Sequence, residues 1–265
     1  MVAHSTNLKM KTIHLPQIYV LPYQVQSAEI NMATDRYLLG MPGTFLRFYG
    51  WDHPTLSFGR MTRKVDDIDL EYCRNHDIRL VKRISGGKTV LHHHELTYSF
   101  ISDTALFPDS VVDTYRIISQ ILLNSFQYFG LGTEMSADKA DDTDSSICFR
   151  EASAFELTVN SKKLVGSAQY RKRDRFFQHG SILLDIDWQA WKQIWRLPDD
   201  STELESRITC INRELTDRPT ITDLVTVITE AFGSFFKAKM VEPVLTQQDR
   251  EEISVLSKKY VWQSV

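Results

Sequence analysis

The sequence predicts a single α+β domain with a mixed, mostly antiparallel central sheet flanked by helices. The first observation is the order of the expected elements, which is helix, strands, helix, strands and helices. A doubly wound parallel fold would need a more regular alternation. The others are the length of 265 residues and a composition with 42% hydrophobic and 25% charged residues, typical of a soluble globular protein. We expect residues 1–26 to be an N-terminal segment and residues 27–265 to form the domain, including its C-terminal helices.

The first half of the domain is predicted to begin with a helix that ends at a glycine. Ser27 is a residue type that caps helix N-termini, and Gly40 follows Leu39 where the helix would end. Aromatic residues alternate along Thr44–Trp51, which is typical of a strand. The elements that follow are a short helix and three strands around a glycine-rich turn: Val65–Asn75, Ile78–Lys82, Thr89–Leu91 and Leu96–Ile101.

The second half is predicted to continue with a helix, three strands and C-terminal helices. The helix starts at Asp109 or Ser110 and runs to Gly130, with apolar positions at helical spacing. A polar, acidic stretch at 136–146 follows and is expected to be a loop. The strands come next: Phe155–Val159, Lys163–Tyr170 and Phe176–Asp185. Two capping-box spacings mark the C-terminal helices: Thr220 with Asp223, and Thr246 with Asp249.

Charge and cysteine usage exclude several classes of function. The formal net charge of −3 gives no overall attraction for nucleic acid. No apolar run approaches the roughly 18 residues of a membrane span. The N-terminus has neither a long apolar stretch nor a small-residue cleavage site that would direct export. The three cysteines are scattered and odd in number, which favours a reducing compartment. We therefore expect a cytoplasmic protein without nucleic-acid or membrane partners.

The stretch Lys82–His94 (KRISGGKTVLHHH) is the first candidate for chemistry. Adjacent glycines let a backbone approach a ligand closely, and exposed amides of such a turn can hold an anion or an acyl carbonyl. A plain hairpin turn is the commoner use of such a pair. Three consecutive histidines in a strand point to alternating faces and do not converge on one ion, so no metal site is predicted.

A lysine and a cysteine are the other candidates. Lys163 precedes a run of small residues, so its ammonium could reach a carbonyl or phosphate oxygen, or else remain a solvated edge lysine. Cys148 lies between the acidic stretch and a strand, and a nucleophilic cysteine needs a nearby cation. Because its sequence neighbours are acidic, any such cation must come from tertiary contacts. Cys73 is expected to be a small buried residue, and Cys210 has no neighbouring signal.

The basic run at 171–175 (RKRDR) has two readings. Most charge runs are solvated surface. The alternative is a docking patch for an acidic protein partner.

Several of these stretches, in order, resemble the biotin/lipoate protein ligase family. KRISGGKTVLHH is similar to its substrate loop, usually written RRxSGGxxVxH, and KLVGSAQ followed by QHGSILLD is similar to its lysine motif and the next strand. NMATDRYLL, WDHPTLSFGR and the final LSKKYVW resemble further family segments, so the likeness spans about Ser27 to Trp262. It implies the fold of the biotin/lipoate ligase catalytic domain.

Within that family, the resemblance favours the cysteine-dependent octanoyltransferase branch. HHHELTYSF stands where ligases more often have an HDxGN-like stretch, Cys148 precedes Phe149 ahead of SAFEL, and GSAQ with QHGSILLD is closer to the octanoyltransferases. The alternatives are an ATP-dependent lipoate ligase, and an amidotransferase that moves acyl groups between lipoyl proteins. No cofactor is expected, and ATP with Mg²⁺ applies only to the ligase alternative.

The resemblance also implies the site residues and the partners. Cys148 and Lys163 are the expected catalytic residues. The donor is expected to be octanoyl-acyl carrier protein, and the acceptor a lipoyl domain such as glycine cleavage H protein or a 2-oxoacid dehydrogenase E2. The expected substrate-binding residues are Arg83, Ser85, Gly86, Gly87, His92, Gly166, Ser167, Ala168, His179 and Gly180.

Overall fold

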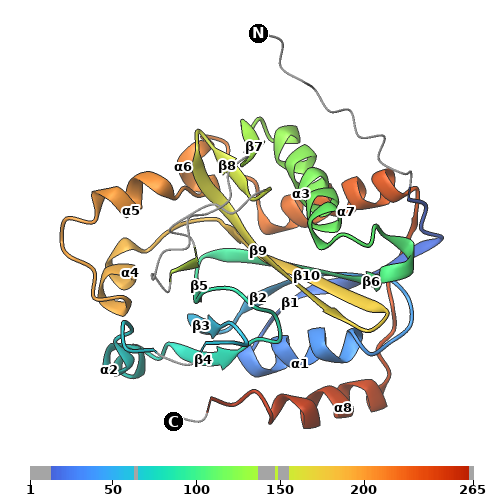
Figure 1. Cartoon of the computed structure of the whole chain (residues 1–265), viewed down its shortest axis with the longest axis horizontal. Coiled ribbons are helices and arrows are strands. Elements are labelled where there is room, and N and C mark those ends of the chain that lie inside the picture. Colours follow the sequence, from blue (N-terminus) through green and yellow to red (C-terminus); the bar gives the residue numbers. More distant parts are fainter. Residues whose placement is uncertain (1–12, 63–64, 137–146, 149–154, 263–265) are drawn as a thin grey trace.

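The computed structural model describes residues 13–62, 65–136, 147–148 and 155–262. Within these ranges, eight strands form the main sheet in the order β11-β1-β2-β6-β10-β9-β8-β7 (Figure 1). β1 is parallel to both of its neighbours, and the other neighbouring pairs are antiparallel. The predicted mixed, mostly antiparallel sheet is therefore confirmed. Its strands are β1 (Gln17–Gln26), β2 (Phe45–Trp51), β6 (Glu95–Asp103), β7 (Thr133–Met135), β8 (Leu157–Val159), β9 (Lys162–Lys172), β10 (Arg175–Leu183) and β11 (Lys239–Val241).

A second, smaller sheet lies beside the main one. Its described strands have the order β4-β3-β5, with β3 parallel to β4 and antiparallel to β5. They are β3 (Thr55–Phe58), β4 (Arg79–Lys82) and β5 (Val90–His92). Apolar residues of this sheet share one buried cluster with the short helices α2, α4 and α5. The short helices are α2 (Leu70–Asn75), α4 (Trp188–Ile194), α5 (Thr202–Arg207) and α6 (Ile211–Glu214), with a 3₁₀ turn at Thr104–Leu106.

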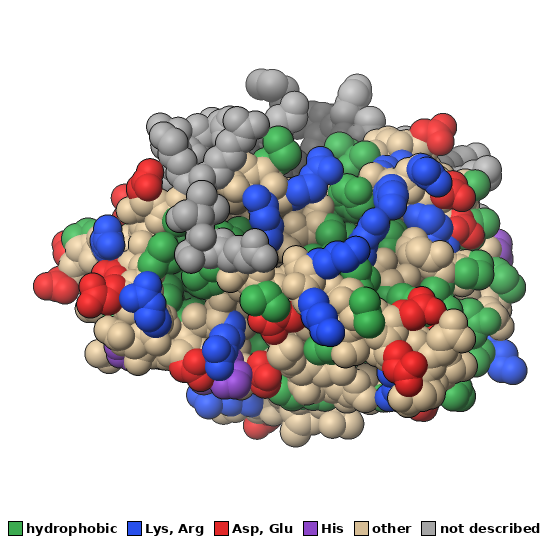
Figure 2. All heavy atoms as spheres, turned by 90° about the horizontal axis from the view of Figure 1, so that it is seen from below, with side chains coloured by type: hydrophobic (Ala, Val, Ile, Leu, Met, Phe, Trp, Pro, Cys, Tyr) green, Lys and Arg blue, Asp and Glu red, His purple; other side chains and the backbone are tan. Residues whose placement is uncertain are grey.

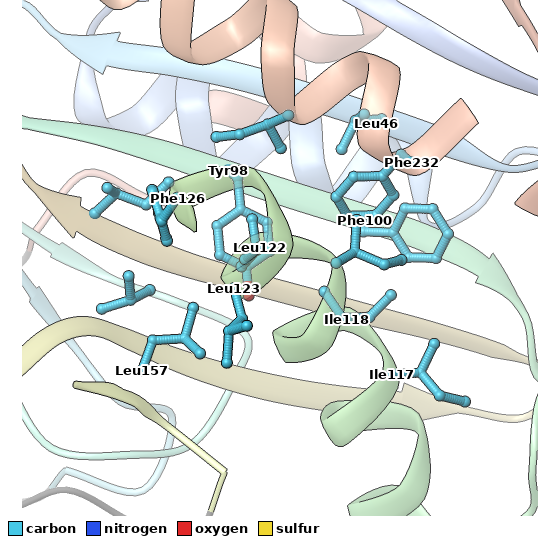
Figure 3. Close-up of a cluster of buried hydrophobic side chains, with 14 of the residues drawn as sticks. Leu46, Tyr98, Phe100, Ile117, Ile118, Leu122, Leu123, Phe126, Leu157 and Phe232 are labelled. Carbon is cyan, nitrogen blue, oxygen red and sulfur yellow. The ribbon is translucent and has the colours of Figure 1, made fainter. Parts of the chain in front are cut away.

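The longer helices cover the two faces of the main sheet (Figure 1). They are α1 (Ala28–Leu38), α3 (Val111–Tyr128), α7 (Ile221–Phe236) and α8 (Gln247–Ser257). α3 and α7 pack on one face, where Phe100 of β6 meets Ile118 of α3 and Phe232 of α7 in the largest core cluster (Figure 3). α1 covers the other face, and α8 packs outside α1. Two helical layers thus enclose a sheet that carries β9 and β10 through the middle of the molecule.

Local sequence signals start several helices as predicted. The hydroxyl of Ser27 accepts a hydrogen bond from the amide of Ile30 at the start of α1. Both predicted capping boxes are present, Thr220 with Asp223 at α7 and Thr246 with Asp249 at α8. No helix in the described part of the chain combines the length and apolar character needed to cross a membrane.

Several elements differ from the prediction, which included neither β7 nor β11. Residues 17–26, assigned above to an N-terminal segment, form β1, which pairs with β2 and β11 inside the main sheet. The helix predicted at Val65–Asn75 is only Leu70–Asn75, because the carboxylate of Asp69 accepts the amide of Tyr72 and so starts the helix there. Most of the predicted acidic loop at 136–146 lies outside the described residues.

Candidate active site

Most of the predicted site residues line one small cavity between the two sheets. Its volume is about 40 Å³, and it is enclosed by the end of β4, the start of β5, β9 and β10. The predicted residues that line it are Arg83, Gly87, His92, Cys148, Gly166, Ser167, Ala168, His179 and Gly180. Ser57, Val90, Thr97 and Ser181 also line it and were not predicted. Four separate stretches of the sequence therefore meet at one place.

Cys148 is attached by its backbone to the start of the small sheet. Its amide donates to the carbonyl oxygen of Thr89 at 3.0 Å, and Ile147 forms a parallel bridge with the same Thr89. The side chain of Cys148 is half-buried at the cavity. The chain therefore presents a thiol next to the glycine-rich loop, 60 residues away in sequence.

Lys163 lies directly beside Cys148, although it is buried within β9. Its ammonium donates to the carbonyl oxygen of Cys148 at 2.7 Å and forms an ion pair with a carboxylate oxygen of Glu156 at 2.7 Å. Both side chains of this ion pair are only 2–3% exposed. The reading of Lys163 as a solvated edge lysine is therefore wrong. Glu156 lies in the SAFEL stretch and was not predicted.

Arg83 holds the glycine-rich loop from within. Its guanidinium donates to the carbonyl oxygens of Ser57, Gly86 and Lys88 at 2.6, 3.0 and 2.6 Å. Gly87 has a φ of +92°, a conformation that favours glycine. Nearby, a Cβ on Gly59 would lie 2.0 Å from the carbonyl oxygen of Gly87. The loop joins β4 to β5, which each pair with β3 and not with each other, so the predicted plain hairpin turn is wrong, and the loop forms a wall of the cavity.

His92 is held in a chain of buried polar groups. Its Nδ1 lies 2.9 Å from a carboxylate oxygen of Glu95 and its Nε2 lies 2.7 Å from the hydroxyl oxygen of Ser57. Because a carboxylate oxygen accepts, Nδ1 of the imidazole donates this hydrogen bond to Glu95. Trp51 stacks on the ring at 4.0 Å between centroids. Ser57 and Glu95 were missed as site residues, although Glu95 stands in the quoted HHHELTYSF.

His179 faces the cavity from β10 and is held by Ser85. The Ser85 hydroxyl oxygen lies 2.6 Å from Nε2 of the imidazole. Burial first, and then the charges of Arg83 and His92, lower the pKa of His179 well below its ordinary value. His179 is therefore neutral at physiological pH and acts as a hydrogen-bonding group, not a cation. Ser85, which does not line the cavity, contributes through this contact.

The small residues predicted on β9 make room for close packing. Gly180 of β10 is opposite Ser167 of β9. A Cβ on Gly180 would lie 2.4 Å from the hydroxyl oxygen of Ser167 and 2.6 Å from a ring carbon of Tyr98. Distances under 3.0 Å force atoms to shift, so glycine is required at this wall of the cavity.

The other cysteines and histidines stand apart from this chemistry. Burial raises the pKa of Cys73 to about 11 and also raises the pKa of Cys210, so neither thiol ionises readily at neutral pH. His93 and His94 stack on each other at 3.7 Å and line a different cavity. Among the described residues, no three or more His, Cys, Asp or Glu side chains are arranged to hold a metal ion.

The basic run is partly engaged within the molecule. The Arg171 guanidinium donates to the carbonyl oxygens of Pro108, Asp109 and Ser110 before α3, and Arg175 is paired with Asp103. Figure 2 shows lysine and arginine side chains gathered near the middle of one face, with acidic side chains around them. The interpretation of residues 171–175 as a docking patch for an acidic protein partner stays a prediction.

Comparisons with known proteins give a consistent picture. A family model described as the lipoyl protein ligase A/B catalytic domain matches residues 27–233. A protein named Octanoyltransferase LipM from Geobacillus kaustophilus is 36% identical over 256 residues, covering 86% of this chain and 89% of the relative. A putative lipoate protein ligase from T. acidophilum with bound lipoic acid has a TM-score of 0.75 at 16% identity, covering 92% of this chain and 95% of that one. A bipartite lipoate protein ligase from Thermoplasma acidophilum, described with its E2 lipoyl domain, has a TM-score of 0.75 at 17% identity, covering 93% of each chain.

Proposed function

The chain belongs to the family of lipoyl protein ligase A/B catalytic domains and is an octanoyltransferase of lipoate biosynthesis, and we propose that it transfers the acyl group through a thioester on Cys148. The observation that carries the mechanism is the position of Cys148. Cys148 lines the same cavity as most of the expected substrate-binding residues, and its carbonyl oxygen accepts a hydrogen bond from the Lys163 ammonium.

The first step transfers the acyl group to the enzyme. The thiolate of Cys148 attacks the carbonyl carbon of an octanoyl thioester, which gives a tetrahedral intermediate with a negative oxygen. The C–S bond to the donor then breaks, and the donor thiolate takes a proton and leaves as a thiol. One thioester replaces another, so the step is close to isoenergetic. The donor in this proposal is octanoyl-acyl carrier protein.

The second step transfers the acyl group to the acceptor. The neutral ε-amine of a lysine attacks the acyl-enzyme carbonyl, the C–S bond to Cys148 breaks, and the nitrogen loses a proton to give an amide. Because an amide is more stable than a thioester, no ATP or other cofactor is needed. The acceptor in this proposal is a lipoyl domain, of glycine cleavage H protein or a 2-oxoacid dehydrogenase E2. Two successive transfers give ping-pong kinetics.

Lys163 and the cavity walls have separate roles in this scheme. The ammonium of Lys163 stabilises the tetrahedral oxyanion, an effect of about 3 kcal/mol for one well-aimed donor. The cavity of about 40 Å³ exceeds the roughly 10–15 Å³ that one water molecule needs on the same measure.

Intact-protein mass spectrometry tests the mechanism. We expect the enzyme mixed with octanoyl-acyl carrier protein, without ATP, to gain the mass of one octanoyl group, and the Cys148→Ser variant to gain none. An enzyme that forms no adduct, and attaches lipoate to a lipoyl domain only when ATP is added, would contradict the proposal and support the ligase alternative. An adduct formed from an octanoylated lipoyl protein, but not from the carrier protein, would support the amidotransferase.

A further inference from the structure

Arg83 is a buried cation whose guanidinium donates hydrogen bonds to uncharged oxygen atoms of the described residues. Its side chain lies at the cavity, and the residue is only 3% exposed. Besides the three carbonyl oxygens, its guanidinium donates to the hydroxyl oxygen of Ser57 at 3.1 Å. A buried cation is costly unless an anion compensates it. The position of Arg83 therefore calls for an anionic partner at the cavity.

Carboxylates in the described part of the chain do not supply that partner directly. Glu95 connects to Arg83 only through His92 and then Ser57. Burial lowers the pKa of Arg83, and the groups that oppose this effect are Cys148 first and Tyr49 second. Of these two, the thiol of Cys148 shares the cavity with Arg83. The glycine-rich loop fixes the position of Arg83 relative to Cys148. Arg83 donates to the carbonyl oxygen of Lys88, and the carbonyl oxygen of the adjacent Thr89 accepts the amide hydrogen of Cys148.

The positive charge of Lys163 is balanced by a carboxylate in an ion pair, whereas, among the described residues, that of Arg83 is not. Its ammonium forms a buried ion pair with Glu156 at 2.7 Å, so the two charges largely cancel at a distance. The contact that it makes with Cys148 is to the carbonyl oxygen of that residue. At the thiol, the field of this pair is therefore weaker than that of a lone cation.

The two histidines at the cavity are each engaged by other side chains. His179 is neutral, as described above. His92 has both ring nitrogens engaged by Glu95 and Ser57. Tyr115 of α3 is also buried, and burial, then Glu156 and other groups including Cys148, raise its pKa well above the ordinary value. Arg83 is thus a cation at the cavity whose hydrogen bonds to described residues go to neutral oxygen atoms, so its charge is available to balance a thiolate.

We propose that the guanidinium of Arg83 stabilises the thiolate of Cys148, while Lys163 acts on the oxyanion that forms later. This division of roles rests on the proposed function, in which Cys148 is the nucleophile. Arg83 also shapes the loop, so a test must separate its charge from its hydrogen bonds. The proton that leaves the thiol passes to solvent, and no other co-reactant is needed.

The test is the pH dependence of alkylation by iodoacetamide in the full-length enzyme without donor. Cys148→Ser gives the background from Cys73 and Cys210. An ordinary cysteine ionises near pH 8.5, and a nearby cation shifts a titration by about one to three pH units. We expect a wild-type midpoint at least about one unit below 8.5, a midpoint raised by about one unit or more in Arg83→Gln, and a smaller rise in Lys163→Gln.

Arg83→Lys separates charge from loop structure. Lysine keeps the positive charge but cannot reproduce the forked hydrogen bonds of the guanidinium. A midpoint near that of the wild type in this variant supports the electrostatic role. Three results overturn the proposal: a wild-type midpoint at 8.5 or above, an unchanged midpoint in Arg83→Gln, or a larger rise in Lys163→Gln than in Arg83→Gln. The first needs no variant to fold. Failure of the proposed function would instead appear as a missing octanoyl adduct on the wild type.

Discussion

At the scale of single residues, Lys163 and Glu156 form a buried ion pair, as do Arg47 and Asp35. Both side chains of the Lys163 pair are almost fully buried, and each would be left with an uncompensated charge if the other were neutralised. Removing one partner of such a pair typically costs about 3–5 kcal/mol. Because Lys163 also holds the carbonyl oxygen of Cys148, the pair connects stability to the position of the nucleophile.

We therefore expect Glu156→Gln to lower the free energy of unfolding by about 3 kcal/mol, as measured by urea denaturation. Lys163→Met should have a similar effect. The double variant should lose clearly less than the sum, because no lone charge is left. The exposed pair of Glu203 with Arg207 is a matched control, since its N–O distance is also 2.7 Å. Glu203→Gln should cost at most about 0.5 kcal/mol. Additive single effects at Glu156 and Lys163 would argue against a coupled pair.

Individual residues of the site were predictable to the extent that their roles are local. The glycine pair was recognised because its turn depends on backbone freedom at Gly87. Ser57 and Glu156 were missed, because a serine in a strand and a glutamate among apolar residues gain their roles only from partners distant in the sequence. The meeting of Lys163 with Cys148 depends on how β9 lies against the glycine-rich loop, which no local pattern contains.

At the scale of elements, α7 and α8 share one capping device but differ in burial. Each has a capping box, built on Thr220 and Thr246 respectively. α7 buries four large apolar side chains in the core. α8 buries only Ile253 and contacts α1 through a hydrogen bond from Tyr37 to Asp249 at 2.5 Å. α8 is therefore expected to open locally, and α7 only when the whole domain unfolds.

We expect Thr246→Ala and Thr220→Ala to have different effects on amide hydrogen exchange. Loss of either cap costs about 1 kcal/mol. In Thr246→Ala, exchange should become about fivefold faster within α8 and stay unchanged in β6 and β10, because 1.4 kcal/mol corresponds to about tenfold. In Thr220→Ala, the slowest-exchanging amides of the main sheet should also become faster. Faster exchange throughout the sheet in Thr246→Ala would show instead that α8 unfolds together with the core.

Elements were predictable where an end signal and a periodic face agree. α3 combines the Ser110 cap with buried Ile118 and Leu122, and both its position and its length were predicted closely. β1 was missed because it lies in the interior of the sheet and its burial does not alternate. β1 lies near the start of the chain and pairs with β2 and with β11, which lies near its end. Only the tertiary structure brings β1 and β11 together.

At the scale of the whole molecule, the site lies where the two sheets meet. This position shields the polar side chains of the site from solvent. Three site residues are buried at this junction: Arg83 at the end of β4, His92 in β5 and His179 in β10. The family resemblance predicted most of the residues that line the cavity there, although not Ser57, and the fold class followed from the order of the elements. The burial itself and its electrostatic effects could not be read from the sequence. These effects give the folded protein a specific dependence on pH.

We expect acid to destabilise the fold through His179. The unfolded histidine has a pKa near 6.5, whereas burial and the nearby Arg83 and His92 hold the folded pKa well below that value. Below about pH 6.5 the unfolded chain therefore binds a proton that the folded chain does not, so stability falls as the pH falls. The stability that neutral His179 contributes is fully present at pH values above the pKa of the unfolded histidine. His93, whose pKa burial also lowers, acts in the same direction.

The measurement is urea unfolding at pH 7.5, 6.5 and 5.5, in the wild type and in His179→Gln. One proton bound only by the unfolded state costs about 1 kcal/mol between pH 7.5 and 5.5. The variant should be less stable at pH 7.5, because the contact with Ser85 changes, but its stability should fall by about 1 kcal/mol less over this range. Groups such as His93 and Asp35 are present in both proteins and cancel in the difference. Parallel pH profiles for the wild type and His179→Gln would mean that the pKa of His179 is the same in the folded and unfolded protein, and would contradict the prediction.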